Sequence, residues 1–175
     1  MNYALARISL AVIVLSFVLG VHAQDKSSGD RRVSSGDRSF IMQATNGGMV
    51  EVVLSKTALQ NSARADVKDF AKRIVDDHEK AGKELASVAA KLGAPSHNPN
   101  VEAHSDMKRF AKLSGEKFDA AYIERMVRDH KGTIALFEKQ ANHGDSGELK
   151  EFARKTLPTL NEHLKMAMAL GEKKK

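Results

Sequence analysis

The stretch "VKDFAKRIVDDHEKAGKELASVAAKL", from Val67 to Leu92, decides the fold of this chain. Apolar and small side chains recur in it at alternating intervals of four and three residues, the spacing of a helix face that packs against other helices. The stripe consists of Val67, Ala71, Ile74, His78, Ala81, Leu85, Val88 and Leu92. The pattern predicts a long amphipathic helix from about residue 65 to residue 92, with one histidine on its packed face.

The rest of the chain predicts three more long helices and no strands. Helices are expected over about 38–60, with Asp37 as the N-cap, over 116–142 and over 148–170, and Pro158 is expected to kink the last one. Ser105 to Leu113 is expected to form a short helix in the connection between the second and third long helices. That connection is long enough either to cap one end of a bundle or to travel its length, so the order of the helices in space stays open. The fold class is therefore all-α, a four-helix bundle with a short extra helix.

Each long helix carries one polar residue in its stripe. The other three stripes are Phe40, Ala44, Gly47, Glu51, Leu54 and Ala58; Ile123, Met126, His130, Thr133 and Phe137; and Leu149, Ala153, Thr156, Leu160, His163, Ala167 and Leu170. A helix rises about 1.5 Å per residue, and counting from the expected turns places Glu51, His78, His130 and His163 within about one turn of each other.

A glutamate and three histidines in an apolar seam need partners, because an unpaired buried polar group is costly. Three imidazoles and one carboxylate form a ligand set for one divalent ion such as zinc, iron or copper. We therefore take Glu51, His78, His130 and His163 as candidate metal ligands. The alternative is a closed hydrogen-bond network among the same side chains that sets the helix register.

Acidic residues precede the three histidines directly. Asp77, Asp129 and Glu162 lie about 100° around the helix from their neighbouring histidines, so they are poor ligands for the same ion. They flank the seam instead. We expect them to orient an imidazole on a neighbouring helix or to pair with a lysine or an arginine.

The glycine pair in "ATNGGMVE" suggests space beside the glutamate. Gly47 lies one turn before Glu51 on the same stripe, and glycine inside a helix costs about 1 kcal/mol relative to alanine. Tyr122 lies two turns before His130. Its ring is expected to pack into the gap at the glycine, or its hydroxyl to donate a hydrogen bond into the cluster.

The first residues read as an export signal. Residues 1–23 contain Arg7, an apolar run from Ile8 to Leu19, and small residues before a cleavage site after Ala23. The run is shorter than the roughly 20 apolar residues of a membrane helix. Residues 24–37 are rich in serine, glycine and charge and are expected to be a flexible leader, and residues 38–172 the bundle domain. The chain has no cysteine, so its stability must come from packing.

Charge and composition limit the partners. The formal net charge is +6, and it falls to +5 if Arg7 is removed with the signal. The basic residues are scattered over polar helix faces, so we expect weak contact with anionic envelope surfaces and no nucleic-acid partner. No nucleophile elbow, phosphate loop or pair of catalytic carboxylates is present, and we expect the protein not to be an enzyme.

Four stretches resemble a bacterial family of unknown function of the DUF4142 type. They are "NGGMVEVVLSKTAL" (46–59), "VKDFAKRIVDDHEKAGKEL" (67–85), "FDAAYIERMVRDHKGTIALFEKQA" (118–141) and "LPTLNEHLKMA" (157–167). This family is grouped with ferritin-like four-helix bundles, and its members are often labelled as outer membrane proteins. The resemblance implies a ferritin-like bundle. The label is at odds with the helical pattern of this sequence, so we expect a periplasmic or secreted protein, associated with the outer membrane at most.

The ligand pattern differs from that of ferritin-like di-iron enzymes. Those proteins place a glutamate three residues before a metal-binding histidine. The residues three before the histidines here are Val75, Val127 and Leu160. Oxygen-activating di-iron chemistry is therefore not expected.

The sequence thus predicts an exported, non-enzymatic helical bundle with a buried Glu/His cluster that is either a closed polar network or a site for one divalent ion. Two alternatives stay open. One is a metal-handling or redox protein of the periplasm that uses zinc, iron or copper. The other is a structural or interaction module of the cell envelope.

Overall fold

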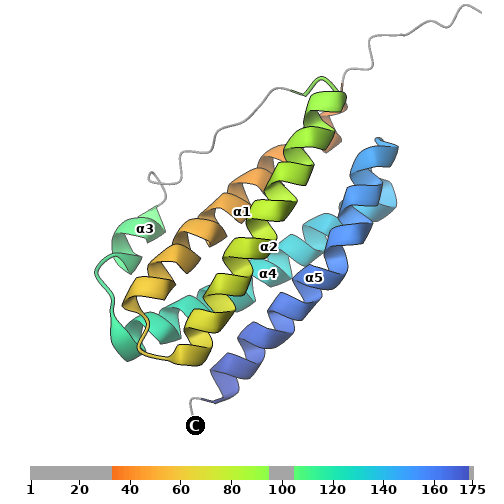
Figure 1. Cartoon of the computed structure of the whole chain (residues 1–175). Coiled ribbons are helices and arrows are strands. Elements are labelled where there is room, and N and C mark those ends of the chain that lie inside the picture. The colour runs from red at the N-terminus through yellow and green to blue at the C-terminus, as the bar shows by residue number, and fades with distance from the viewer. Residues whose placement is uncertain (1–32, 95–104, 174–175) are drawn as a thin grey trace, which may run out of the picture. The chain divides into compact units, whose positions relative to one another are not determined.

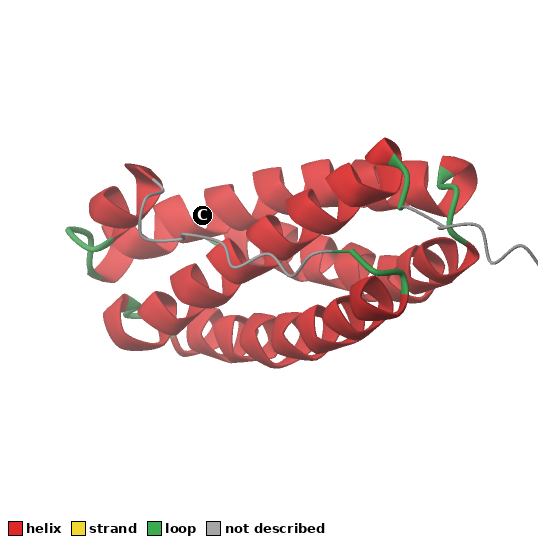
Figure 2. Ribbon diagram, turned by 90° about the horizontal axis from the view of Figure 1, so that it is seen from above, coloured by secondary structure: helices red, strands yellow, loops and turns green. Residues whose placement is uncertain are grey.

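The described part of the chain folds into four long helices and one short one (Figure 1). The computed structural model describes residues 33–94 and 105–173, and these residues contain no strand (Figure 2). The helices are α1 (Ser35–Asn61), α2 (Ala65–Lys91), α3 (Ser105–Phe110), α4 (Gly115–His143) and α5 (Gly147–Glu172). The all-α bundle with a short helix before its third long helix is confirmed. The expected export signal and most of the expected leader lie outside the described residues.

The helices form two antiparallel pairs, α1 with α2 and α4 with α5. Each pair packs against the other through α1 with α4 and α2 with α5. Asn61, the last residue of α1, donates from Nδ2 to the carbonyl of Leu113, just before α4, at 3.0 Å. Helix α4 therefore begins at the end of the bundle where α2 also begins, so α2 and α4 run in the same direction (Figure 1). Of the two orders left open by the sequence, the structure has the one in which the second and third long helices are parallel.

Two apolar clusters fill the bundle, one toward each end. One cluster is built around Tyr122, whose ring packs against those of Phe70 and Phe118. The other is built around Phe40, Phe137 and Phe152, with the first two ring centroids 5.0 Å apart. Burial of this apolar surface is the main source of stability. Glu51 and the three stripe histidines belong to neither cluster. Along α2, α4 and α5 the histidines fall between the buried residues of the two clusters, and along α1 Glu51 directly follows Val50, the first α1 residue of the Phe70 cluster.

Helix α1 is capped by a different residue from the one the sequence predicted. Ser34 is the N-cap, and its hydroxyl accepts from the backbone N–H of Asp37 at 3.1 Å. Asp37 is buried, and its carboxylate accepts from Nε2 of Gln140 at 2.7 Å and from the backbone N–H of Ser146 at 2.8 Å. The prediction of Asp37 as N-cap is wrong because its carboxylate is engaged by the turn between α4 and α5. The helix begins three residues before the expected domain start at residue 38.

The remaining boundaries lie close to those expected. Helix α3 ends at Phe110 rather than Leu113, and a turn in which the N–H of Leu113 donates to the Phe110 carbonyl at 3.1 Å follows it. Pro158, where the sequence predicts a kink, lies inside α5, which is continuous from Gly147 to Glu172. The other helix ends differ from the expected ones by one or two residues.

Candidate metal centre

Three histidines from three helices meet between the two apolar clusters. His78 comes from α2, His130 from α4 and His163 from α5, and each offers one ring nitrogen within 4.8 Å of the other two. The ring centroids of His130 and His163 lie 5.3 Å apart, and that of His78 lies 5.7 Å and 5.5 Å from them. His130 and His163 are fully buried. The seam positions of the sequence stripes thus converge in space.

Hydrogen bonds on the outer side of two rings fix which nitrogen carries the proton. Nδ1 of His130 lies 3.0 Å from the carbonyl of Met126, which can only accept, so this nitrogen donates and Nε2 keeps a lone pair. Nε2 of His163 lies 2.9 Å from Oδ2 of Asp77. Burial favours the neutral form of Asp77, but hydrogen bonds from Arg73 and His163 outweigh it and hold the pKa of the carboxyl below its usual value. Nε2 of His163 therefore donates, and its Nδ1 keeps the lone pair.

These two lone pairs point at each other. Nε2 of His130 and Nδ1 of His163 are 3.3 Å apart, and with both rings neutral neither nitrogen can donate to the other. The contact between these two nitrogens becomes favourable only when a proton or a metal cation lies between them. Outer hydrogen bonds to a carbonyl and a carboxylate that aim free imidazole nitrogens inward are the usual support of a metal-binding histidine.

The histidines are held neutral by burial. Burial lowers the pKa of His78 to about 3, with the neighbouring histidines adding to the shift, and it lowers the pKa of His130 to about 4. The pKa of His163 is also lowered by burial, against the opposing effect of Asp77. Neutral imidazoles are the form that binds metal, so no proton needs to be displaced from these nitrogens at neutral pH.

Glu51 lies beside the histidines rather than among the three converging nitrogens. Its Oε2 is 3.1 Å from Nε2 of His78, and its Oε1 is 3.4 Å from Nδ1 of His130, the nitrogen already bonded to Met126. Nε2 of His78 is buried and makes no hydrogen bond. Burial raises the pKa of Glu51 to about 8, the charge of Asp129 adds to the shift, and Arg125 opposes it. The sequence grouped Glu51 with the three histidines as a ligand, whereas the structure places its carboxyl to one side of them.

The acidic residues next to the histidines have different neighbours. Asp77 bonds His163 on the adjacent helix and accepts from Nε of Arg73 at 2.8 Å. Arg73 also donates to Oε2 of Glu162 at 3.1 Å, so one arginine joins the two acids at the surface. Asp129 pairs with Arg125 and lies 3.5 Å from Nε of Arg128, and it bonds none of the three histidines.

Tyr122 and the glycine pair behave differently from the expectation. The Tyr122 hydroxyl lies 2.7 Å from Oγ of Ser55, which follows Glu51 by one turn, and burial raises the pKa of the phenol. Sequence reading missed Ser55, although its spacing from Glu51 placed it on the same face. Gly47 is exposed, so the prediction that it clears space beside Glu51 is wrong. Gly48 takes that place, since a Cβ there would lie 3.5 Å from Nδ1 of His78.

A cleft of about 620 Å³ reaches the cluster from the surface. Asp77, His78 and His163 lie along it, and its walls come from α1, α2, α4 and α5. This cleft could not be predicted from the sequence, because its shape depends on how four helices are spaced.

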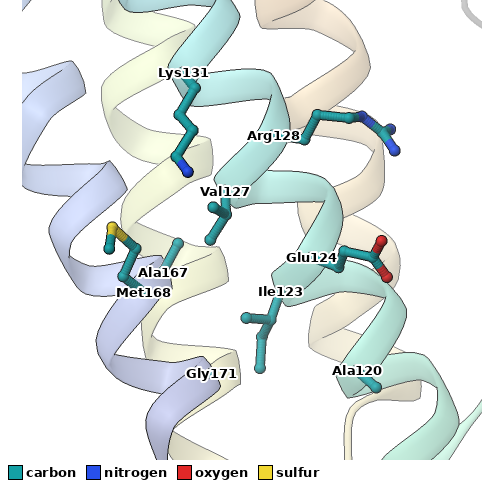
Figure 3. Close-up of a pocket in the computed structure, with 9 residues that line it drawn as sticks. All are labelled: Ala120, Ile123, Glu124, Val127, Arg128, Lys131, Ala167, Met168 and Gly171. Atoms are coloured by element: carbon teal, nitrogen blue, oxygen red, sulfur yellow. The ribbon is translucent and has the colours of Figure 1, made fainter.

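A second groove, of about 540 Å³, lies between α4 and α5 and holds none of the cluster residues. Its floor includes Ile123, Val127 and Ala167, with Met168 and Lys131 at its edge (Figure 3). In the same view Glu124 and Arg128 extend away from α5. The candidate site is therefore the histidine cluster and its cleft.

A helical bundle with a buried histidine cluster is the class that the fold and the site define. The chain belongs to the DUF4142 family, a domain of unknown function, which matches residues 22–170. No curated protein matches it by sequence. None of the helices within residues 33–94 and 105–173 is both long and apolar enough to cross a membrane.

Solved structures with the same fold share little sequence with the chain. A DUF305 fragment from Deinococcus radiodurans is 17% identical, with a TM-score of 0.68 over 80% of this chain and 98% of that one. CopM in its Cu(I)-bound form is 18% identical, with a TM-score of 0.67 over 78% of this chain and 95% of that one. At these identities the likeness establishes a shared helical-bundle fold.

Proposed function

We propose that this is an exported, non-enzymatic protein that binds one metal ion through His78, His130 and His163. The observation that carries the proposal is the distance of 3.3 Å between Nε2 of His130 and Nδ1 of His163. Both nitrogens are unprotonated, because the other nitrogen of each ring donates a hydrogen bond on the far side of the ring. Asp77 holds the ring of His163. Glu51, whose pKa burial raises to about 8, would give up its proton to balance the charge of a bound ion. A metal ion bound there would supply the positive charge that the facing nitrogens need.

The ligand set favours a first-row ion that accepts imidazole. Zinc, copper and iron all do so, and copper binds nitrogen ligands most tightly among the divalent ions. The solved structures of CopM, which share this fold, are described in Cu(I)-bound, Cu(II)-bound and silver-bound forms. Copper is therefore the ion to test first, with zinc and iron beside it.

Thermal unfolding of protein purified without a histidine tag tests the proposal. One ion per chain is expected, and at about 100 times its dissociation constant it should stabilise the fold by about 2.7 kcal/mol. His130→Ala and His163→Ala should abolish this stabilisation. The control is His143→Ala, at an exposed histidine at the end of α4, which should leave it unchanged. The proposal fails if zinc, copper and iron neither bind nor shift the melting temperature.

A second candidate is a closed polar layer whose role is to set the helix register, as in a structural or interaction module of the envelope. The 3.1 Å separation between Oε2 of Glu51 and Nε2 of His78 favours it, since a small reorientation would let a protonated carboxyl donate to that nitrogen, which makes no hydrogen bond as it stands. In this case, metal ions would leave the melting temperature unchanged, whereas replacing the layer by apolar residues would disturb the fold.

The single long connection between α2 and α4 supports the ferritin-like assignment.

Export to the periplasm or beyond is supported by residues 1–23. Export predicts that protein recovered from a periplasmic or culture fraction begins at Gln24. N-terminal sequencing of that fraction checks the prediction. Protein found only in the cytoplasm with Met1 retained would contradict it.

A further inference from the structure

Two of the proposed metal ligands line the cleft, and most of its exposed lining surface is apolar. His78 and His163 are among its lining residues, together with the buried apolar residues Val52, Leu85, Phe137, Phe152 and Leu160. Its volume of about 620 Å³ lies in the range of pockets that bind small organic ligands, which are also apolar with a few polar groups at one point. A ligand in this cleft would meet apolar side chains along its length and imidazoles at its end.

The mouth of the cleft carries an excess of positive charge. Lys56 pairs with Glu79 at 2.7 Å, and Lys155 pairs with Glu84 at 2.7 Å. Lys80 and Lys83 also line the cleft, are exposed, and join none of the ion pairs of the described residues. Lys83 also acts electrostatically on Glu79. With four lysines against three acids among its lining residues, the cleft would attract an anion.

Three protein ligands leave a metal ion with an exchangeable position, as in sites where a water or a substrate completes the coordination. His78 and His163 line the cleft, whereas the ring of His130 does not. We take the cleft as the route by which a fourth ligand reaches the ion, because two of the three histidines line it. Without a metal, the buried imidazoles are costly to charge and offer little to an anion.

We propose that the cleft binds a small organic anion with an apolar body, such as an aromatic or short aliphatic carboxylate, whose acid group becomes the fourth ligand of the bound ion. The proposal rests on the metal site proposed above. It makes metal and anion binding mutually dependent: each tightens the other by the same factor.

Titration of the Cu²⁺-loaded protein with benzoate tests the proposal, read by visible absorption and electron paramagnetic resonance. Benzoate should change the copper spectrum and bind about ten-fold or more tightly than acetate, because the ring is buried in the cleft. Benzyl alcohol, which has the ring without the charge, should leave the spectrum unchanged. Metal-free protein should bind benzoate much more weakly, and benzoate should lower the Cu²⁺ dissociation constant by the matching factor.

Two variants with matched controls test the role of the cleft. Thr159→Phe places a ring in the cleft and should abolish benzoate binding with Cu²⁺ binding retained, whereas Thr57→Phe, outside the cleft, should leave both intact. Lys80→Glu with Lys83→Glu should weaken benzoate binding about two- to five-fold, more so at low salt. Lys117→Glu with Lys139→Glu makes the same change in charge away from the cleft and should have little effect.

The outcomes separate this proposal from the one on which it rests. If benzoate does not change the copper spectrum, or if acetate changes it at the same concentration, the cleft proposal is wrong and the metal-site proposal is unaffected. Benzoate binding that survives Thr159→Phe, in a variant whose helical circular dichroism matches that of the natural chain, overturns the cleft proposal as well. The absence of any copper spectrum refutes the metal site itself, and the anion site with it.

Discussion

At the residue scale, the properties of the cluster follow from a few short contacts. Asp77 and the Met126 carbonyl set the tautomers of two rings, and His78 and Glu51 complete the layer. The sequence stripes identified all four seam residues, because a helical period determines which side chains face inward. They could not show that Glu51 lies beside the histidines, since that depends on side-chain direction.

The opposite pKa shifts of Glu51 and the histidines predict a maximum of stability near pH 6.5 for the metal-free protein. His78 and His130 have folded pKa values of about 3 and 4, below the unfolded value of about 6.5, so stability falls as the pH drops below 6.5. Glu51 has a folded pKa of about 8, above its unfolded value of about 4.3, so its contribution is lost as the pH rises toward 8.

Melting temperatures between pH 5 and pH 8 measure this maximum. One proton per group corresponds to about 1.4 kcal/mol per pH unit, so a net change of order 1 kcal/mol per unit is expected on each side. Glu51→Gln cannot titrate and should lose the fall above pH 6.5 while keeping the fall below it. A melting temperature that is flat across the range would show that these groups are not buried as described.

At the element scale, helix ends depend on partners distant in sequence. Asp37 is the clearest case, because a residue chosen as the cap of α1 accepts hydrogen bonds from Gln140 and from the start of α5. Gly47 and Gly48 give a second case. Adjacent helix positions differ by about 100°. Placing the stripe one residue too early therefore selected Gly47, which is exposed, instead of Gly48, which lies beside His78. Helix existence could be predicted from local pattern, whereas these contacts could not.

Replacing Asp37 should destabilise the turn between α4 and α5. Asp37→Ala removes the acceptor of Gln140 Nε2 and of the Ser146 N–H, and the expected loss is about 2–3 kcal/mol because the bonds to a buried carboxylate are charge-assisted. Urea unfolding measures it. Asp37→Asn should recover part of the loss. Glu116→Ala, at an exposed acid in the first turn of α4, should cost no more than about 0.5 kcal/mol. Equal losses for the two alanine variants would contradict the role given to Asp37.

At the scale of the whole bundle, a polar layer separates two apolar clusters. The sequence predicted such a layer by counting residues from the helix ends, and the convergence of Glu51, His78, His130 and His163 agrees with that count. It could not choose between the two helix orders, because both place these residues at mid-height. The cleft could not be predicted either, since it arises from the spacing of whole helices.

Replacing the entire layer by apolar residues should keep or raise stability. A variant with Glu51→Leu, His78→Leu, His130→Met and His163→Leu removes every buried polar group of the cluster at once, and such changes are often neutral or stabilising by about 1–4 kcal/mol. Urea unfolding with and without Cu²⁺ should show a stable fold that no longer responds to metal. The free energy of unfolding of the fourfold variant is compared with that of Glu51→Leu alone, in which the three buried histidines remain. A fourfold variant that loses its cooperative transition would instead favour the layer as a determinant of register.

The antiparallel pairs have a consequence for the order of folding events. Each pair is a hairpin of helices near in sequence, and local contacts of this kind form quickly. His78 belongs to the first hairpin, and His130 and His163 to the second, so the three nitrogens meet only after the hairpins dock. A bound ion would then act as a removable cross-link between two preformed halves. It would slow their separation while leaving the rate of hairpin formation unchanged, so metal would extend the lifetime of the folded protein more than it speeds folding.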